Sequence, residues 1–191
     1  MPPLSSNAPI GVFDSGIGGL SVLRALREEL PHERFVYLAD SAHTPYGEKG
    51  DAFVRGRSLA ITRHLVSEHA IKLLVVACNT ATAAAVHLLR DTFPDLAMVG
   101  VEPALKPAAH TSRTHHVGVL ATRGTVASAR FGELLARNNE HTQFSVQACD
   151  GLAQAIEQST LEPLPAAASL EKTRALCARY MGALGPFGTR D

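Results

Sequence analysis

Short apolar runs alternate with stretches of helical periodicity along the chain. Because most of these runs are unbroken, they are typical of strands that are covered on both faces. The six predicted strands are Ile10–Phe13, Phe35–Ala39, Leu73–Ala77, Met98–Val101, Val117–Ala121 and Phe144–Ala148. Between them, apolar residues recur every three or four positions, as in the stripe Leu20, Leu23, Leu26 and Leu30. This alternation predicts an α/β fold with parallel-type sheets flanked by helices.

The order of the elements suggests two lobes. A strand gives way near Gly100–Pro107 to a new helix, so we expect a first α/β lobe over residues 1–100 and a second over 101–191. A predicted helix around Leu170–Leu184 is followed by Gly185-Pro186, and a helix that ends in Gly-Pro is normally followed by another helix or strand. We therefore expect a truncated chain whose second half is incomplete.

Composition narrows the function classes. The 191 residues are 46% hydrophobic and 19% charged, with 18 basic and 18 acidic side chains, so a nucleic-acid binder is not favoured. No apolar run approaches the ~20 residues that span a bilayer. Cys78, Cys149 and Cys177 form no disulfide or metal spacing, and we expect a reducing cytoplasm and no metal. The pair His115-His116 is interpreted as a solvated pair before a strand.

Polar segments follow four of the predicted strands. Ligands of open parallel sheets bind beyond the carboxyl ends of the strands, so these segments predict one pocket. They are Asp14-Ser15-Gly16-Ile17-Gly18-Gly19, Asp40-Ser41 with His43-Thr44-Pro45-Tyr46-Gly47, Cys78-Asn79-Thr80, and Thr122-Arg123-Gly124-Thr125. The glycine-rich turn has neither P-loop nor dinucleotide spacing. Its Asp14 suits either a substrate ammonium group or the capping of the turn.

Cys78 is the strongest candidate for catalysis. It lies just past an apolar strand and just before a predicted helix over Ala81–Arg90. Helix N–H groups favour thiolate, so we expect the pKa of Cys78 to fall from about 8.5 into the range of roughly 3.5–7.5. Cys149, before Asp150-Gly151, and Cys177, inside a helix, are interpreted as structural, with Cys177 buried.

The chain resembles the cofactor-independent Asp/Glu racemases, and glutamate racemases in particular. The resemblance rests on four segments, in order: Gly11–Ser21, Pro45–Gly47, Ala77–Ala81 and Gly118–Thr122. It implies two pseudo-symmetric lobes and two cysteines on opposite faces of the substrate α-carbon. One thiolate removes the α-proton and the other thiol donates one, without a cofactor. The implied product, D-glutamate, feeds peptidoglycan synthesis for the cell wall and cell shape.

The resemblance carries over to individual residues. Cys78 matches the first catalytic cysteine, Asp14 the acid that assists it, and Glu157 a glutamate near the second base. Ser15, Tyr46, Gly47, Asn79 and Thr80 match substrate contacts, and Pro45, Thr122 and Thr125 complete the expected substrate-binding set. The implied partners are glutamate and a second copy in a homodimer.

One departure changes the expected activity. The second cysteine of these racemases lies in a Gly-Cys-Thr-His-Tyr-Pro segment, and this sequence contains no Cys-Thr-His. We therefore expect the chain by itself to be inactive or impaired. Two alternatives remain: a racemase acting on aspartate or another small acid, and a non-catalytic fragment or binding module.

Overall fold

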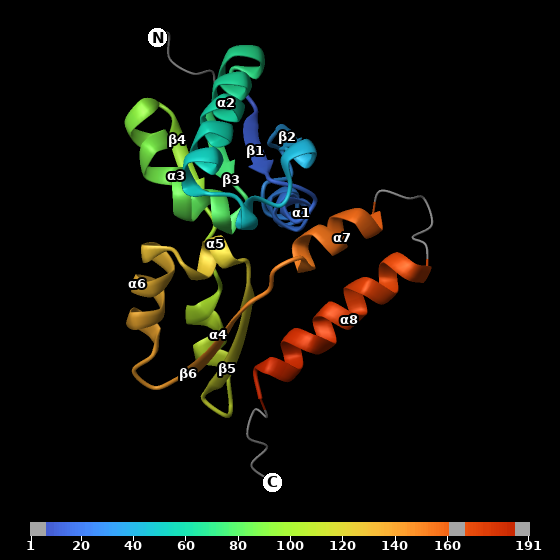
Figure 1. Cartoon of the computed structure of the whole chain (residues 1–191). Helices are drawn as coiled ribbons and strands as arrows, with labels where there is room; N and C mark the ends of the chain where they lie inside the picture. The colour runs from blue at the N-terminus through green and yellow to red at the C-terminus, as the bar shows by residue number, and fades with distance from the viewer. Residues whose placement is uncertain (1–6, 161–166, 186–191) are drawn as a thin grey trace. The chain divides into compact units, whose positions relative to one another are not determined.

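The computed structural model describes residues 7–160 and 167–185, and contacts divide the chain into two compact units, Met1–Glu102 and Pro103–Asp191. In the first unit (Figure 1) the elements are β1 Ile10–Asp14, α1 Gly19–Glu29, β2 Phe35–Ala39, the short 3₁₀ helices η1 Ser41–His43 and η2 Tyr46–Glu48, α2 Asp51–His69, β3 Leu73–Val76, α3 Asn79–Thr92 and β4 Ala97–Gly100. In the second they are α4 Leu105–Thr111, β5 His116–Ala121, α5 Arg123–Val126, α6 Ala129–Asn138, β6 Gln143–Ala148, α7 Leu152–Thr160 and α8 Ala167–Ala183. The predicted α/β class, with parallel sheets flanked by helices, is confirmed.

The first unit is a four-stranded parallel sheet in the order β2-β1-β3-β4. Successive side chains of a strand point to opposite faces, and this divides the core into two layers. On one face Phe13, Leu74 and Val76 pack with residues of α2 and α3. On the other face Val12 and Val75 pack against apolar residues of α1. The central strand β1 is buried along its whole length, which fixes where its C-terminal Asp14 lies.

The second unit contains a parallel pair, β5-β6. Val119 of β5 forms a small core with Leu105 of α4 and Phe131 of α6. The prediction that the strands are covered on both faces is correct for β1 and mostly for β3, but wrong for β2, β4, β5 and β6. An edge strand, or a strand in a two-stranded sheet, has fewer neighbours to bury it, and a run of apolar letters does not reveal its place in the sheet.

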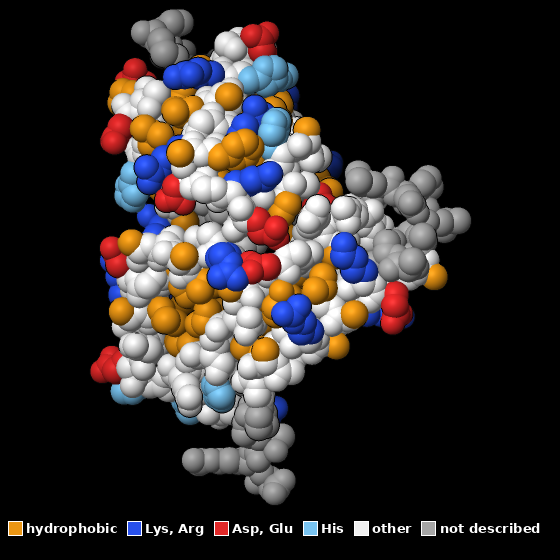
Figure 2. All heavy atoms as spheres, in the orientation of Figure 1, with side chains coloured by type: hydrophobic (Ala, Val, Ile, Leu, Met, Phe, Trp, Pro, Cys, Tyr) orange, Lys and Arg blue, Asp and Glu red, His pale blue; other side chains and the backbone are white. Residues whose placement is uncertain are grey.

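The surface agrees with the balanced composition. On the face seen in Figure 2, Lys and Arg side chains are interspersed with Asp and Glu on both units. Among the described helices, none combines the length and apolar character needed to cross a membrane.

Candidate active site

Cys78 caps the N-terminus of α3. Its backbone is extended, and its Sγ accepts a hydrogen bond from Ala81 N at 3.4 Å. The Sγ also lies 3.6 Å from Ser15 Oγ, which follows β1. Because β1 and β3 are neighbours in register, the segments that follow them meet at one edge of the sheet. The predicted junction of strand, thiol and helix is therefore present.

The expected direction of the thiol pKa is wrong. Burial raises the pKa of Cys78 to about 11, and the charge of Asp14 adds to the rise. Hydrogen bonds from Ala81 and Ser15 lower it again, but by less. The side chain is only 6% exposed, so desolvation of a thiolate outweighs the donors at the helix start. The surroundings of Cys78 in this conformation therefore favour the protonated thiol over the thiolate.

Asp14 organises the glycine-rich turn. Its Oδ2 accepts hydrogen bonds from Gly16 N at 3.1 Å and from Gly19 N at 3.0 Å. A Cβ on Gly19 would lie 2.6 Å from the Asp14 Cβ and 2.9 Å from the Tyr37 hydroxyl, so only glycine allows this close approach. Tyr37 in turn donates to Gly16 O at 2.9 Å. The capping role considered for Asp14 is therefore real, and its charge also acts on Cys78.

The segment after β2 is held by a buried carboxylate. Asp40 receives hydrogen bonds from Tyr46 Oη at 2.6 Å and from Arg57 at 2.8 and 2.9 Å, and His43 Nδ1 lies 2.9 Å away. Burial would raise the pKa of Asp40, but hydrogen bonds from Arg57, Tyr46 and His43 lower it to about 2. Burial and the Asp40 carboxylate raise the pKa of Tyr46.

This arrangement changes what Tyr46 offers to a ligand. Its ring belongs to the same buried cluster as Cys78, and its hydroxyl donates to Asp40. Pro45 and Gly47 beside it are also buried. In this conformation Tyr46 forms a wall next to the thiol rather than an exposed hydrogen-bonding group.

The first residues of α3 complete this edge of the sheet. Asn79 is exposed and Thr80 is 7% exposed. The structure thus brings Asp14, Ser15, Tyr46, Cys78 and Thr80 together at the C-terminal ends of β1, β2 and β3. These are predicted site residues from three separate segments.

The remaining predicted site residues belong to the second unit. Thr122 caps α5: its Oγ1 accepts from Thr125 N at 3.4 Å and lies 3.1 Å from Thr125 Oγ1. Glu157 is half-buried on α7. The substrate and second-base roles of these three residues stay predictions.

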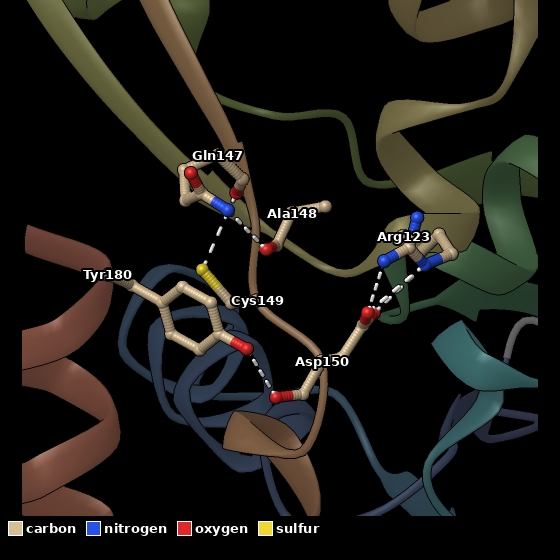
Figure 3. Close-up of polar contacts among 6 residues, drawn as sticks. All are labelled: Arg123, Gln147, Ala148, Cys149, Asp150 and Tyr180. Atoms are coloured by element: carbon tan, nitrogen blue, oxygen red, sulfur yellow. Dashed lines mark hydrogen bonds and ion pairs between the residues drawn. The ribbon is translucent and has the colours of Figure 1, made fainter. Parts of the chain in front are cut away.

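The end of β6 carries Cys149 and a group of polar contacts (Figure 3). Cys149 is buried, and its Sγ donates to Gln147 O at 3.4 Å. Burial also raises the pKa of Cys149. The neighbouring Asp150 forms an ion pair with Arg123, and its carbonyl accepts from Tyr180 Oη of α8 at 2.7 Å. Cys177 is half-buried rather than buried as predicted, since α8 presents that position at a partly open surface.

Comparison with known proteins identifies the family. The sequence profile of the family described as Asp/Glu/Hydantoin racemase matches residues 10–184. The chain belongs to this racemase family.

Individual relatives of this chain are named glutamate racemase. The protein from Ectopseudomonas mendocina is 54% identical over 157 residues, which are 82% of this chain and 59% of the relative. The protein from Pseudomonas paraeruginosa is 49% identical over 93% of this chain and 64% of the relative. The chain thus spans about three fifths of the length of the relatives it matches.

Solved structures of glutamate racemases have a fold similar to that of this chain. Glutamate racemase of Escherichia coli, in complex with L-glutamate and the activator UDP-MurNAc-Ala, superposes with a TM-score of 0.77 at 36% identity, covering 91% of this chain and 64% of that one. Glutamate racemase from Aquifex pyrophilus gives a TM-score of 0.70 at 33% identity, covering 92% of this chain and 66% of that one.

Two residues that support the candidate site were not predicted from the sequence. Asp40 was seen only as part of a polar segment, and Arg57 was not noticed. The pair joins residues 17 positions apart, across the start of α2. A cationic residue on an otherwise apolar helical face was the available signal. Because this signal does not indicate which residue the arginine contacts, the pair could be identified only from the structure.

Proposed function

We propose that this chain carries the Cys78 half of the proton-transfer site of a glutamate racemase. The observation that supports this most strongly is the position of the Cys78 Sγ between Ser15 Oγ and Ala81 N, at the start of a helix and beside Asp14. The family match and relatives named glutamate racemase support glutamate as the substrate.

Binding in this proposal follows from the charges of the substrate. The N–H groups and hydroxyls at the start of α3 and in the β1–α1 turn suit a carboxylate, because helix N-termini favour negative charge. Asn79, Thr80 and Ser15 are the side chains at that position. Asp14 is an acceptor that attracts the substrate ammonium group.

The ammonium group also adjusts the acid–base chemistry. The Asp14 charge contributes to the high pKa of Cys78. A bound ammonium beside Asp14 offsets that charge, which lowers the thiol pKa when the substrate arrives. The thiolate then takes the α-proton, the C–H electron pair passes into the substrate carboxylate, and nearby donors stabilise the charge that develops.

Inversion needs a second acid on the opposite face of the α-carbon. This sequence has no Cys-Thr-His segment, which the resemblance assigns to that acid. In the proposal, the chain alone returns the proton, or a deuteron from solvent, to the face from which it came. Joined to the second thiol, the site produces D-glutamate for peptidoglycan synthesis in the cytoplasm.

The test follows the α-proton in heavy water. The 191-residue chain is incubated separately with D- and L-glutamate, and loss of the α-proton signal is measured by NMR together with optical rotation. The proposal predicts exchange of one enantiomer, D-glutamate, with little net racemisation. Absence of exchange from both enantiomers would refute it, and rapid racemisation would show a second acid elsewhere in this chain.

A further inference from the structure

Asp40 is fixed in place by both its backbone and its side chain. Its N–H donates to Asp14 O at 3.0 Å, which ties it to the end of β1. Its Oδ1 accepts from Arg57 Nη2 at 2.8 Å and lies 2.9 Å from His43 Nδ1. Its Oδ2 accepts from Arg57 Nε at 2.9 Å and from Tyr46 Oη at 2.6 Å. This carboxylate therefore joins α2 and η2 to the C-terminal end of the sheet.

Arg57 sets the orientation and the charge of this carboxylate. A guanidinium forms two parallel hydrogen bonds only with a carboxylate that lies near its plane, so the pair restricts rotation of the Asp40 side chain. Burial acts to raise the pKa of Asp40, but the hydrogen bond from Arg57 opposes it, followed by those from Tyr46 and His43. An ionised and oriented Oδ2 is a strong acceptor for the Tyr46 hydroxyl. Without Arg57, burial would favour a protonated carboxyl, which is a weaker acceptor.

Tyr46 connects this ion pair to the thiol. Its side chain is fully buried and belongs to the cluster that contains Cys78 and Ala81. The helix η2 that carries Tyr46 packs against α3, which Cys78 caps. Burial and the Asp40 carboxylate raise the pKa of Tyr46, and a negative charge on Cys78 acts in the same direction, so the phenol and the thiol lie within electrostatic range.

We propose that Arg57 is a positioning residue of the thiol site: through the Asp40 carboxylate it holds the Tyr46 ring beside Cys78 and keeps water away from the sulfur. Loss of the guanidinium frees the Asp40 side chain to turn, the Tyr46 hydroxyl loses its oriented acceptor, and solvent reaches the thiol. Exclusion of water strengthens the electrostatic interactions of a proton-transfer site. The benefit for proton transfer rests on the proposed function, whereas the shielding of Cys78 is measured without substrate.

The experiment measures alkylation of Cys78 by iodoacetamide in the folded 191-residue chain over a range of pH. Peptide mass spectrometry follows Cys149 in the same samples. In Arg57→Met, we expect Cys78 to react at least about tenfold faster than in wild type near pH 8, because a hydrated thiol is more accessible and ionises more readily. The midpoint of its pH profile should move to lower pH. The rate at Cys149, in the second unit, should not change.

Ile10→Ala tests whether lost stability alone produces this effect. Ile10 is a buried residue at the start of β1, in the core layer that packs against α1, and its truncation should cost stability comparable to the loss in Arg57→Met. We expect Cys78 in Ile10→Ala to react at least about tenfold more slowly than in Arg57→Met, because it is exposed only when the unit unfolds.

Two further variants at α2 separate geometry from charge. Arg57→Lys restores a cation beside Asp40 but not the two parallel hydrogen bonds, so its Cys78 should react at a rate between those of wild type and Arg57→Met. Arg63→Met removes an exposed arginine from the same helix and should match wild type.

A double-mutant cycle tests the path through Tyr46. Tyr46→Phe keeps the ring but removes the donor to Asp40, so it should also accelerate alkylation of Cys78. Adding Arg57→Met to Tyr46→Phe should change the rate by less than about twofold, because the link is already broken.

Two results would overturn the inference. The first is a Cys78 rate in Arg57→Met no higher than in wild type or in Ile10→Ala, which would leave Arg57 with a role in stability alone. The second is a pair of independent, multiplicative effects in the cycle, which would mean that Arg57 does not act through Tyr46. Absence of α-proton exchange in the wild-type chain would refute the proposed function and leave both of these measurements decisive.

Discussion

The guanidinium of Arg57 forms two hydrogen bonds with the carboxylate of Asp40, at 2.9 and 2.8 Å. Asp40 in turn accepts from the hydroxyl of Tyr46, whose ring lies in the same buried cluster as Cys78. An ion pair in the first unit therefore supports Tyr46, which forms one wall of the candidate site.

Removing Arg57 should destabilise the fold. Arg57→Met leaves the Asp40 carboxylate buried without its cationic partner, and we expect the free energy of unfolding to fall by about 2–3 kcal/mol. Arg63→Met, an exposed arginine on the same helix, should change it by less than about 0.5 kcal/mol. Urea unfolding measures both, and equal losses in the two variants would contradict this role for Arg57.

The stability contributed by Asp40 should depend on pH. Its pKa in the folded chain, about 2, lies below the ordinary value of 3.8, so the contribution is complete above 3.8 and is lost as the pH falls toward 2. Between about pH 6 and about pH 3, the difference in unfolding free energy between wild type and Asp40→Asn should shrink by about 1 kcal/mol. A difference that stays constant or grows on acidification would be inconsistent with a depressed pKa.

Alkylation of Cys78 should report its high pKa. The rate of reaction with iodoacetamide, followed by peptide mass spectrometry, is expected to increase with pH up to about 11. Asp14→Asn removes a nearby negative charge while keeping an oxygen for the Gly16 and Gly19 N–H groups, so the rate profile should move to lower pH. A shift to higher pH in this variant would show that Asp14 does not raise the thiol pKa.

A methyl group at Gly19 should not fit. Gly19→Ala brings a Cβ against Asp14 and Tyr37, and we expect a loss of about 1–3 kcal/mol in unfolding free energy. Gly132 on α6 has no atom within 4 Å of an added Cβ, so Gly132→Ala should instead stabilise the chain by about 0.5–1 kcal/mol. Thermal unfolding of both variants makes the comparison, which fails if Gly19→Ala is neutral.

Local patterns were sufficient for most of the fold. The six apolar runs predicted the strands to within about one residue at each end. In an α/β chain, a short apolar run bounded by polar turns is usually a buried strand. The polar residues after β1, β2 and β3 met at one edge, because parallel strands end together. Cys78 was found in this way, from its place at the end of a strand.

Long-range packing limited the rest. The pKa of Cys78 was expected to fall, because the helix start is visible in the sequence while the burial of the thiol is not. The exposed face of β5 was not predicted, because the apolar residues of one strand do not indicate how many strands lie beside it in the sheet. The Asp40–Arg57 pair forms because α2 places Arg57 beside Asp40. Helical periodicity in the sequence indicates which face Arg57 occupies, but it does not indicate which residue it contacts.

The most direct test of the central claim is the dependence of α-proton exchange on Cys78. Wild type, Cys78→Ser and Cys177→Ser are incubated with D-glutamate in heavy water, and deuterium incorporation is measured by NMR per mole of folded chain. We predict that exchange is abolished in Cys78→Ser and retained in Cys177→Ser. Exchange that survives in Cys78→Ser at the wild-type rate would contradict the account.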